Sequence, residues 1–316
     1  MQEYQKNAGG LLNSGFKLTA EILGQEPEPW QIVSKGSWAR GDMGQFSDLD
    51  TVIFSQKSEP SNQPYYQALL QLFRVYLIGL GQPWCFVNGR VEPTGLYFDK
   101  GDLNIFLPPE LDANDNNASN SSSNLAIKLN LIQSPEELAK KVSETLSSSK
   151  HADEAWQSSY SLLLLKNMYG HNALIDKFYD EIVPQINLSD VAKKSLSFIK
   201  GHELMGLDMR PLPLKNVCKI FLLTMLNLTY LQLQPEKLKQ LDLNIIWQLF
   251  SAQLEPAFAA RWREAVGTIL RWRTKYQAKY KNRDVLVHQM SQDEQDFIAH
   301  AKMTLIAPFM QELSGI

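Results

Sequence analysis

The hydrophobic residues of the first hundred positions recur at both helical and strand-like intervals. Apolar side chains at helical spacing predict helices over Leu11–Leu23 and Tyr65–Leu80, with a Pro-containing break at Glu26–Pro29 after the first. Short apolar runs predict strands at four places, Gln31–Ser34, Leu49–Phe54, Cys85–Val91 and Leu96–Leu107. This mixture of elements favours an α+β or α/β domain.

The pattern changes after this region. Residues 112–124, DANDNNASNSSSN, are polar and of low complexity, which predicts a flexible surface loop. Ala126–Ile132 alternates like one more strand, and Ser134-Pro135 has the residues of a helix start. Nearly everything beyond is expected to be helical. We therefore predict an α+β domain over residues 1–133, with a small mixed sheet flanked by helices, and an all-α helical bundle over residues 134–316.

The segment with the most distinctive chemistry is Gly36–Phe54, GSWARGDMGQFSDLDTVIF. Gly36 and Ser37 follow a predicted strand and begin a tight turn, where backbone N–H groups and a hydroxyl can approach a polyphosphate. Asp48 and Asp50 lie on the next predicted strand. Because alternate strand residues share a face, their carboxylates are expected to project together, and Leu49, Thr51 and Ile53 to face the other way.

Two carboxylates on one strand face predict a divalent cation. They repel each other unless a cation lies between them, and oxygen ligands suit Mg²⁺. Such ions can polarise an α-phosphate, activate a hydroxyl and stabilise departing pyrophosphate. We therefore expect Asp48 and Asp50 to be catalytic residues and Mg²⁺ ligands, with Gly36 and Ser37 holding the phosphates of an NTP. The alternative is that both aspartates are surface residues at a strand start.

This motif resembles the signature of the DNA polymerase β-type nucleotidyltransferase superfamily, in which Gly-Ser and a gap of about ten residues precede Asp-x-Asp. The version with Gly36, Arg40, Gly41 and Asp42 is similar to the bacterial uridylyltransferase that modifies PII signal proteins, and to related nucleotidyltransferases with a C-terminal helical substrate-binding domain. Weaker similarities to those relatives occur in four further segments, residues 68–90, 161–178, 202–223 and 290–313. The segment 161–178 resembles their leucine-rich helix, glycine and apolar helix.

The resemblance implies a polymerase β-like fold and a third carboxylate that acts as base or second metal ligand. Asp102, in the segment GDLNIF, is the best candidate; Asp99 and Glu92 are alternatives, and Asp102 as a simple turn residue is equally compatible. The resemblance also favours transfer of a nucleoside monophosphate to a hydroxyl on a protein, such as a tyrosine of a signalling protein.

Basic residues raise further candidates. Arg40 is expected either to contact the triphosphate or to form a surface pair with Asp42. Lys35 and Trp38 are expected to be structural or solvated. The segment 261–283 is basic and aromatic, and we expect a solvated basic face with Trp262, Val266, Ile269, Tyr276 and Tyr280 in the core, although binding of RNA or an acidic protein stays open.

Two other functions have weaker sequence signals. Arg283 and His288 fit the loose Arg-x4-His pattern of ribonucleases that pair with small nucleotidyltransferases in toxin–antitoxin systems. The remaining histidines have no metal-ligand spacing. Modification of a small cationic molecule such as an aminoglycoside is an alternative, which an acidic pocket between the domains would support. A catalytically silent nucleotide-binding regulator is another.

Composition adds limits on location and partners. The net charge of −3 argues against a protein that coats nucleic acid. Only two cysteines occur, Cys85 and Cys218, which favours a reducing compartment. The first residues do not have a signal-peptide pattern, and the apolar stretch Ile220–Leu233 is interrupted by polar residues, so we expect a cytoplasmic protein with a buried helix there.

Overall fold

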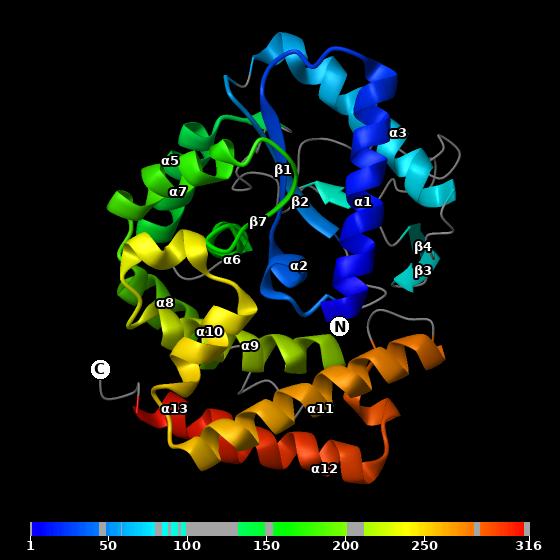
Figure 1. Ribbon diagram of the computed structural model, residues 1–316. Helices are drawn as coiled ribbons and strands as arrows, with labels where there is room; N and C mark the ends of the chain where they lie inside the picture. Colours follow the sequence, from blue (N-terminus) through cyan, green and yellow to red (C-terminus); the bar gives the residue numbers. More distant parts are fainter. Residues whose placement is uncertain are drawn as a thin grey trace, which may run out of the picture.

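A computed structural model describes most of the chain (Figure 1). The described residues are 2–43, 49–57, 59–79, 84–87, 90–93, 96–98, 132–148, 154–200, 212–280 and 285–312. Asp48, Asp99, Asp102, Arg283, the predicted loop 112–124 and most of the predicted strand Ala126–Ile132 lie outside this set.

The centre of the N-terminal part is a five-stranded sheet in the order β5-β2-β1-β7, with β6 also paired to β2. Its strands are β1 (Trp30–Ser34), β2 (Leu49–Ser55), β5 (Leu96–Phe98), β6 (Ile132–Gln133) and β7 (Lys166–Gly170). β1 runs antiparallel to both β2 and β7, whereas β5 and β6 run parallel to β2. The predicted strands at Gln31–Ser34 and Leu49–Phe54 are therefore confirmed, and so is the α+β class.

Two long helices cover one face of this sheet, α1 (Gln2–Leu23) and α3 (Gln63–Gly79) (Figure 1). Phe16 of α1 stacks on Phe73 of α3 with ring centroids 3.7 Å apart. Gly15 allows this close approach, because a Cβ atom there would lie 2.4 Å from the ring of Tyr76. The helix predicted over Leu11–Leu23 is confirmed as the C-terminal part of α1, on which Leu12 and Phe16 are buried and Leu11, Leu18 and Ile22 are exposed.

The other face of the sheet packs on the first helices of the remaining chain. α5 (Pro135–Ser147) begins as predicted, since the Ser134 hydroxyl accepts a hydrogen bond from the backbone N–H of Glu137. α5 packs along α7 (Ala173–Ile182), and Phe54 of β2 stacks on Phe178 of α7. Val33, Val52 and Phe54 therefore join the large core of the helical region, while Trp30, Ile32 and Ile53 face α1 and α3.

Apart from β7, the described elements beyond residue 148 are helical. The longer elements among them are α6 (Glu154–Ser161), α8 (Leu188–Phe198), α9 (Leu214–Tyr230), α10 (Leu243–Ser251), α11 (Pro256–Tyr280), α12 (Gln292–Ala301) and α13 (Ala307–Glu312). Shorter helical turns are η1 (Pro60–Asn62), η2 (Val183–Gln185), η4 (Pro235–Gln240), η5 (Val287–Gln289) and η6 (Lys302–Ile306). α9 is the buried helix predicted near Ile220–Leu233, and α8, α10 and α11 pack around it.

Two predictions of secondary structure are wrong. The single strand predicted over Cys85–Val91 is instead a pair, β3 (Trp84–Val87) and β4 (Arg90–Pro93), which pair antiparallel with Val87 opposite Arg90. The helical pattern expected over residues 161–178 fails at β7, which pairs with β1. The N-terminal sheet therefore includes residues from beyond the predicted boundary at residue 133. Of the strand expected over Leu96–Leu107, the described part is β5.

The basic segment 261–283 lies mostly on α11, and its aromatic stripe is largely buried as expected. Trp262, Ile269 and Tyr276 belong to the core, but Tyr280 is 40% exposed, so its assignment to the core is wrong. Arg273 also differs from a solvated basic face, because it is only 2% exposed.

Within the described residues, no helix has both the length and the apolar character that crossing a membrane requires.

Candidate active site at the end of the β1–β2 pair

The turn after β1 is shaped to bring Asp50 against it. The backbone N–H of Lys35 donates a 2.9 Å hydrogen bond to the carbonyl oxygen of Asp50, which extends the β1–β2 ladder by one residue. Gly36 has φ of +63°, in the left-handed region that favours glycine. A Cβ atom at Gly36 would also lie 2.7 Å from Oδ2 of Asp50. The turn therefore requires glycine on two independent grounds.

The turn leads into a single short helix, α2 (Gly36–Arg40), where the sequence predicted only a tight bend. Gly41 ends this helix in the left-handed conformation with φ of +85°, and the N–H of Asp42 donates to the carbonyl oxygen of Ser37 over 3.0 Å. Ser37 is buried and Arg40 is at the last position of α2. This compact loop holds both residues on the side of the sheet end where Asp50 lies.

Gly36, Ser37, Arg40 and Asp50 line one cavity of about 330 Å³. The opposite walls come from α6, α8 and α9. The charged side chains on the described walls are four cations and one carboxylate, namely Lys35, Arg40, Lys215, Lys219 and Asp50. An environment of this charge favours an anionic occupant.

Residues 7–91 match the model of the family described as "Putative nucleotidyltransferase DUF294". The matched segment contains Gly36, Ser37, Arg40, Asp48 and Asp50, and Asp102 lies beyond it. The match supports a nucleotidyltransferase family for this part of the chain, and it does not extend to a particular nucleotide or acceptor, or to closeness to PII uridylyltransferases. No curated protein matches the chain.

Of the six residues predicted as the nucleotidyltransferase site, the structure brings four together at the cavity, and Asp48 and Asp102 are outside the described residues. Asp50 pairs in register with Tyr97 of β5, the strand after which Asp99 and Asp102 follow in sequence. Glu92 lies in β4, opposite Cys85. Within the described residues, no group of three or more His, Cys, Asp or Glu side chains forms a candidate metal site.

Lys35 is a member of the cavity wall that the sequence reasoning did not include. Its side chain is 5% exposed, and its Nζ donates a hydrogen bond to Oγ of Ser158 over 3.3 Å. Burial lowers the pKa of Lys35 to about 8, although the neighbouring Asp50 carboxylate acts in the opposite direction. The sequence signal for this role was the position of Lys35 directly before Gly36.

The lysines of α9 were missed as well. Lys215 and Lys219 are four residues apart in the segment LKNVCKIFLL, so they share one helix face, and both line the cavity. Two lysines at this spacing within an otherwise apolar helix were a readable signal of a polar cavity. Only the tertiary fold could show that this face lies opposite the turn at Gly36.

The inner wall of the cavity is aromatic and hydrogen-bonded. Trp156 stacks on Tyr160 with ring centroids 5.4 Å apart and an interplanar angle of 17°. The Tyr160 hydroxyl donates to Oδ1 of Asn227 over 2.7 Å, and Nδ2 of Asn227 donates to the Ser195 hydroxyl over 2.9 Å. Burial raises the pKa of Tyr160 above its ordinary value, so this hydroxyl stays protonated. This part of the lining is uncharged and aromatic, which suits packing against a planar group.

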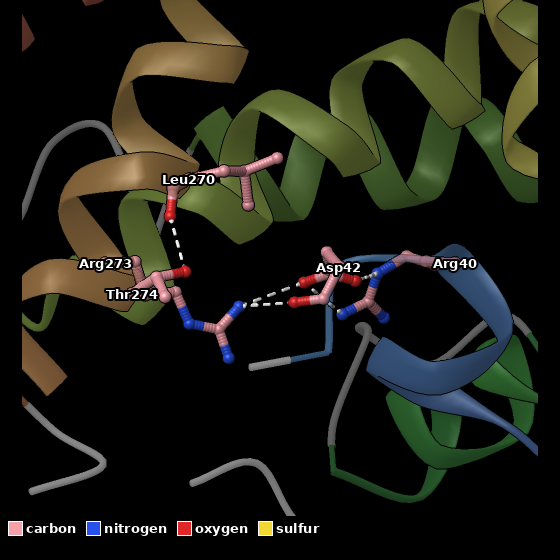
Figure 2. Close-up of polar contacts among 5 residues, drawn as sticks. All are labelled: Arg40, Asp42, Leu270, Arg273 and Thr274. Atoms are coloured by element: carbon pink, nitrogen blue, oxygen red, sulfur yellow. Dashed lines mark hydrogen bonds and ion pairs between the residues drawn. The ribbon is translucent and has the colours of Figure 1, made fainter. Parts of the chain in front are cut away.

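Arg40 and Asp42 form the pair that the sequence offered as one alternative for Arg40, but the pair is not on the surface. Nε of Arg40 donates to Oδ1 of Asp42 over 3.0 Å, and Nη2 donates to Oδ2 over 3.4 Å. Asp42 is 2% exposed and also accepts from Arg273 of α11 (Figure 2). Arg40 therefore both lines the cavity and belongs to a buried ionic cluster.

Proposed function

We propose that this protein transfers a nucleoside monophosphate from an NTP to an acceptor hydroxyl and releases pyrophosphate. The observation that supports this most directly is the cavity, in which the Asp50 carboxylate and the Gly36–Ser37 turn share one wall with Lys35 and Arg40. The match of residues 7–91 to a nucleotidyltransferase family agrees with it.

The charges of the cavity suit the proposed substrate. A triphosphate carries several negative charges, and the cationic side chains of Lys35, Arg40, Lys215 and Lys219 can neutralise them. In the reaction, the acceptor oxygen bonds to the α-phosphorus, and the bond from that phosphorus to the bridging oxygen of pyrophosphate breaks. The acceptor proton passes to a base, for which Asp102 stays our candidate.

Mg²⁺ fits the described residues in kind, because Asp50 and Ser37, whose side chains carry oxygen atoms, both line the cavity. We propose that Asp50 holds the metal together with Asp48, the residue two positions earlier. When bound there, Mg²⁺ would polarise the α-phosphate and neutralise charge on the departing pyrophosphate. The protein's own contribution is to fix Asp50 against the turn and to surround the phosphates with cations.

The acceptor remains a proposal from the motif resemblance, namely a hydroxyl on a protein. Modification of an aminoglycoside is less well supported, because an acidic pocket would favour it and the charged residues of the described cavity wall are mostly cationic. No specific observation favours the silent regulator or the toxin–antitoxin component.

The test is transfer of label from each α-labelled NTP, with Mg²⁺ and a cell lysate as the source of acceptor. We expect labelling by the wild-type protein and a loss of about a hundredfold or more in Asp50→Asn and in Asp48→Asn/Asp50→Asn. Asp296→Asn is the matched control, since Asp296 is an exposed residue of α12. Equal labelling by the Asp50→Asn protein would defeat the proposal.

A further inference from the structure

Asp42 is shared between two arginines that are far apart in sequence (Figure 2). Arg40 approaches it from the end of α2, and Arg273 approaches from α11 on the other side. Nη1 of Arg273 donates to the backbone carbonyl oxygen of Asp42 over 2.9 Å and to Oδ2 over 3.3 Å. Asp42 and Arg273 are both only 2% exposed, so the contact is buried.

The three side chains have unequal access to the cavity. Arg40 lines the cavity, whereas Asp42 and Arg273 are not among its wall residues. A carboxylate paired with Arg40 alone would neutralise its guanidinium, and the pair would attract a phosphate only weakly. Arg273 supplies a second positive charge to the same carboxylate, so the three side chains together carry one net positive charge. The cluster places that charge beside the cavity, at Arg40.

We propose that Arg273 is a positioning residue for the phosphate site, which acts through Asp42 to keep the charge of Arg40 available to the phosphates of the substrate. The inference rests on the proposed function for the identity of the substrate, but its electrostatic part concerns any polyphosphate in the cavity. It assigns a role in the site to α11, an element that lies outside the segment matched by the nucleotidyltransferase family.

The contact with the backbone adds a geometric component. Because Arg273 binds the carbonyl oxygen of Asp42, it fixes the chain directly after α2 and Gly41 as well as the carboxylate. Arg273 also lies beside the buried Cys218 of α9, whose thiol it can hydrogen-bond. Arg273 of α11, which lies beside Cys218 of α9, therefore connects the helical region to the loop that ends in Asp42.

The experiment measures binding of inorganic tripolyphosphate to the full-length protein by calorimetry, without metal. We expect Arg40→Gln and Arg273→Gln each to weaken the affinity about tenfold, although Arg273 is outside the cavity wall. The control is Arg271→Gln, which removes an exposed arginine of the same helix and should leave the affinity unchanged. Wild-type affinity in a folded Arg273→Gln protein would overturn the inference, and so would undetectable binding by the wild type.

A double variant that neutralises both charges separates the electrostatic role of Arg273 from its geometric one. Without Asp42, the Arg40 guanidinium has no carboxylate to neutralise it, so Asp42→Asn/Arg273→Gln should bind tripolyphosphate within about threefold of the wild type. The Arg273→Gln protein keeps the buried Asp42 carboxylate but lacks one of its two cationic partners, which can prevent folding. The double variant has no buried carboxylate at residue 42, so it is expected to fold even where Arg273→Gln does not. Arg273→Lys should likewise stay within about threefold. A tenfold loss in the folded double variant would contradict the inference.

These outcomes are distinguishable from failure of the proposed function. If the wild type binds tripolyphosphate with the expected dependence on Arg273 but transfers no label from any NTP, the inference holds for a polyphosphate site and nucleotidyl transfer is wrong. If label is transferred and the Arg273→Gln protein binds tripolyphosphate as the wild type does, nucleotidyl transfer is supported and the inference about Arg273 is wrong.

Discussion

Oδ2 of Asp50 lies 2.7 Å from the point that a Cβ atom would occupy on Gly36. This relationship ties the conformation of the turn to the placement of the carboxylate on which the proposed chemistry depends. Either residue can be changed separately, and each change affects the geometry of the other.

Gly36→Ala should damage both stability and transfer. The substitution forces an L side chain into φ of +63° and against the Asp50 carboxylate, so we expect a loss of about 1–3 kcal/mol in the free energy of unfolding. Denaturant unfolding measures it. Gly10→Ala is the matched control, because a Cβ atom at that helical position meets nothing within 4 Å and should stabilise by about 0.5–1 kcal/mol. Similar behaviour of the two variants would contradict the interpretation.

The buried ammonium of Lys35 should make stability depend on pH. Its pKa in the folded chain is about 8, below the ordinary 10.5, so between these values the unfolded chain binds more protons. The buried charge of Lys35 lowers the free energy of unfolding in full below pH 8. This destabilisation decreases as the pH rises from 8 to 10.5.

Removal of that charge provides the test. Lys35→Met should raise the free energy of unfolding at pH 7 by up to about 3 kcal/mol, and the difference from the wild type should vanish towards pH 10.5. Urea unfolding in EDTA at several pH values measures this, with the exposed Lys140→Met as control. A constant difference across the pH range would refute the assignment. We also expect weaker tripolyphosphate binding in Lys35→Met.

Cys218 should be inert in the folded protein. Burial raises the pKa of its thiol to about 12, against an ordinary value of 9, so at pH 8 its thiolate fraction falls by about a thousandfold. In a Cys85→Ser background, where Cys218 is the remaining cysteine, a thiol reagent should react slowly with the native chain and rapidly with the urea-unfolded chain. Equal rates in the two states would show that the packing of α9 around this thiol is looser than described.

The fragment 1–133 should not fold on its own, although the sequence suggested it as a domain. It lacks β7, which pairs with β1, and it lacks the helices that cover Val33, Val52 and Phe54. We expect a far-ultraviolet circular dichroism spectrum of an unfolded chain and no cooperative melting, in contrast to the full-length protein. A cooperative transition near the melting temperature of the full chain would support the boundary predicted at residue 133.

The elements that the sequence predicts best are those with a strong local signal. β1 and β2 are short apolar runs, and the start of α5 has a serine cap and a proline, so local chemistry determines them. The β3–β4 hairpin also had a local signal, the dipeptide Asn88-Gly89, which favours a two-residue turn and argues against one continuous strand.

Other features depend on partners distant in sequence. The five residues of β7 have no strand pattern of their own, and they are a strand because β1 offers a free edge and Gly170 can adopt φ of +96°. The sequence could likewise nominate Asp50 with Gly36, since both lie in one motif. It could not show that Lys215, Lys219 and Arg273 converge on that motif, because helices distant in the chain bring them there.

The position of β1 between β2 and β7 has a consequence for synthesis of the protein. Gln31 of β1 hydrogen-bonds Asn167 of β7 across 136 residues of chain. During translation, one edge of β1 therefore stays unpaired until β7 has been synthesised and has emerged from the ribosome. Phe54 of β2 likewise stays uncovered until α7 has emerged. We expect the nascent chain to present an unsatisfied strand edge throughout that interval, which is a target for chaperones and a hazard for self-association.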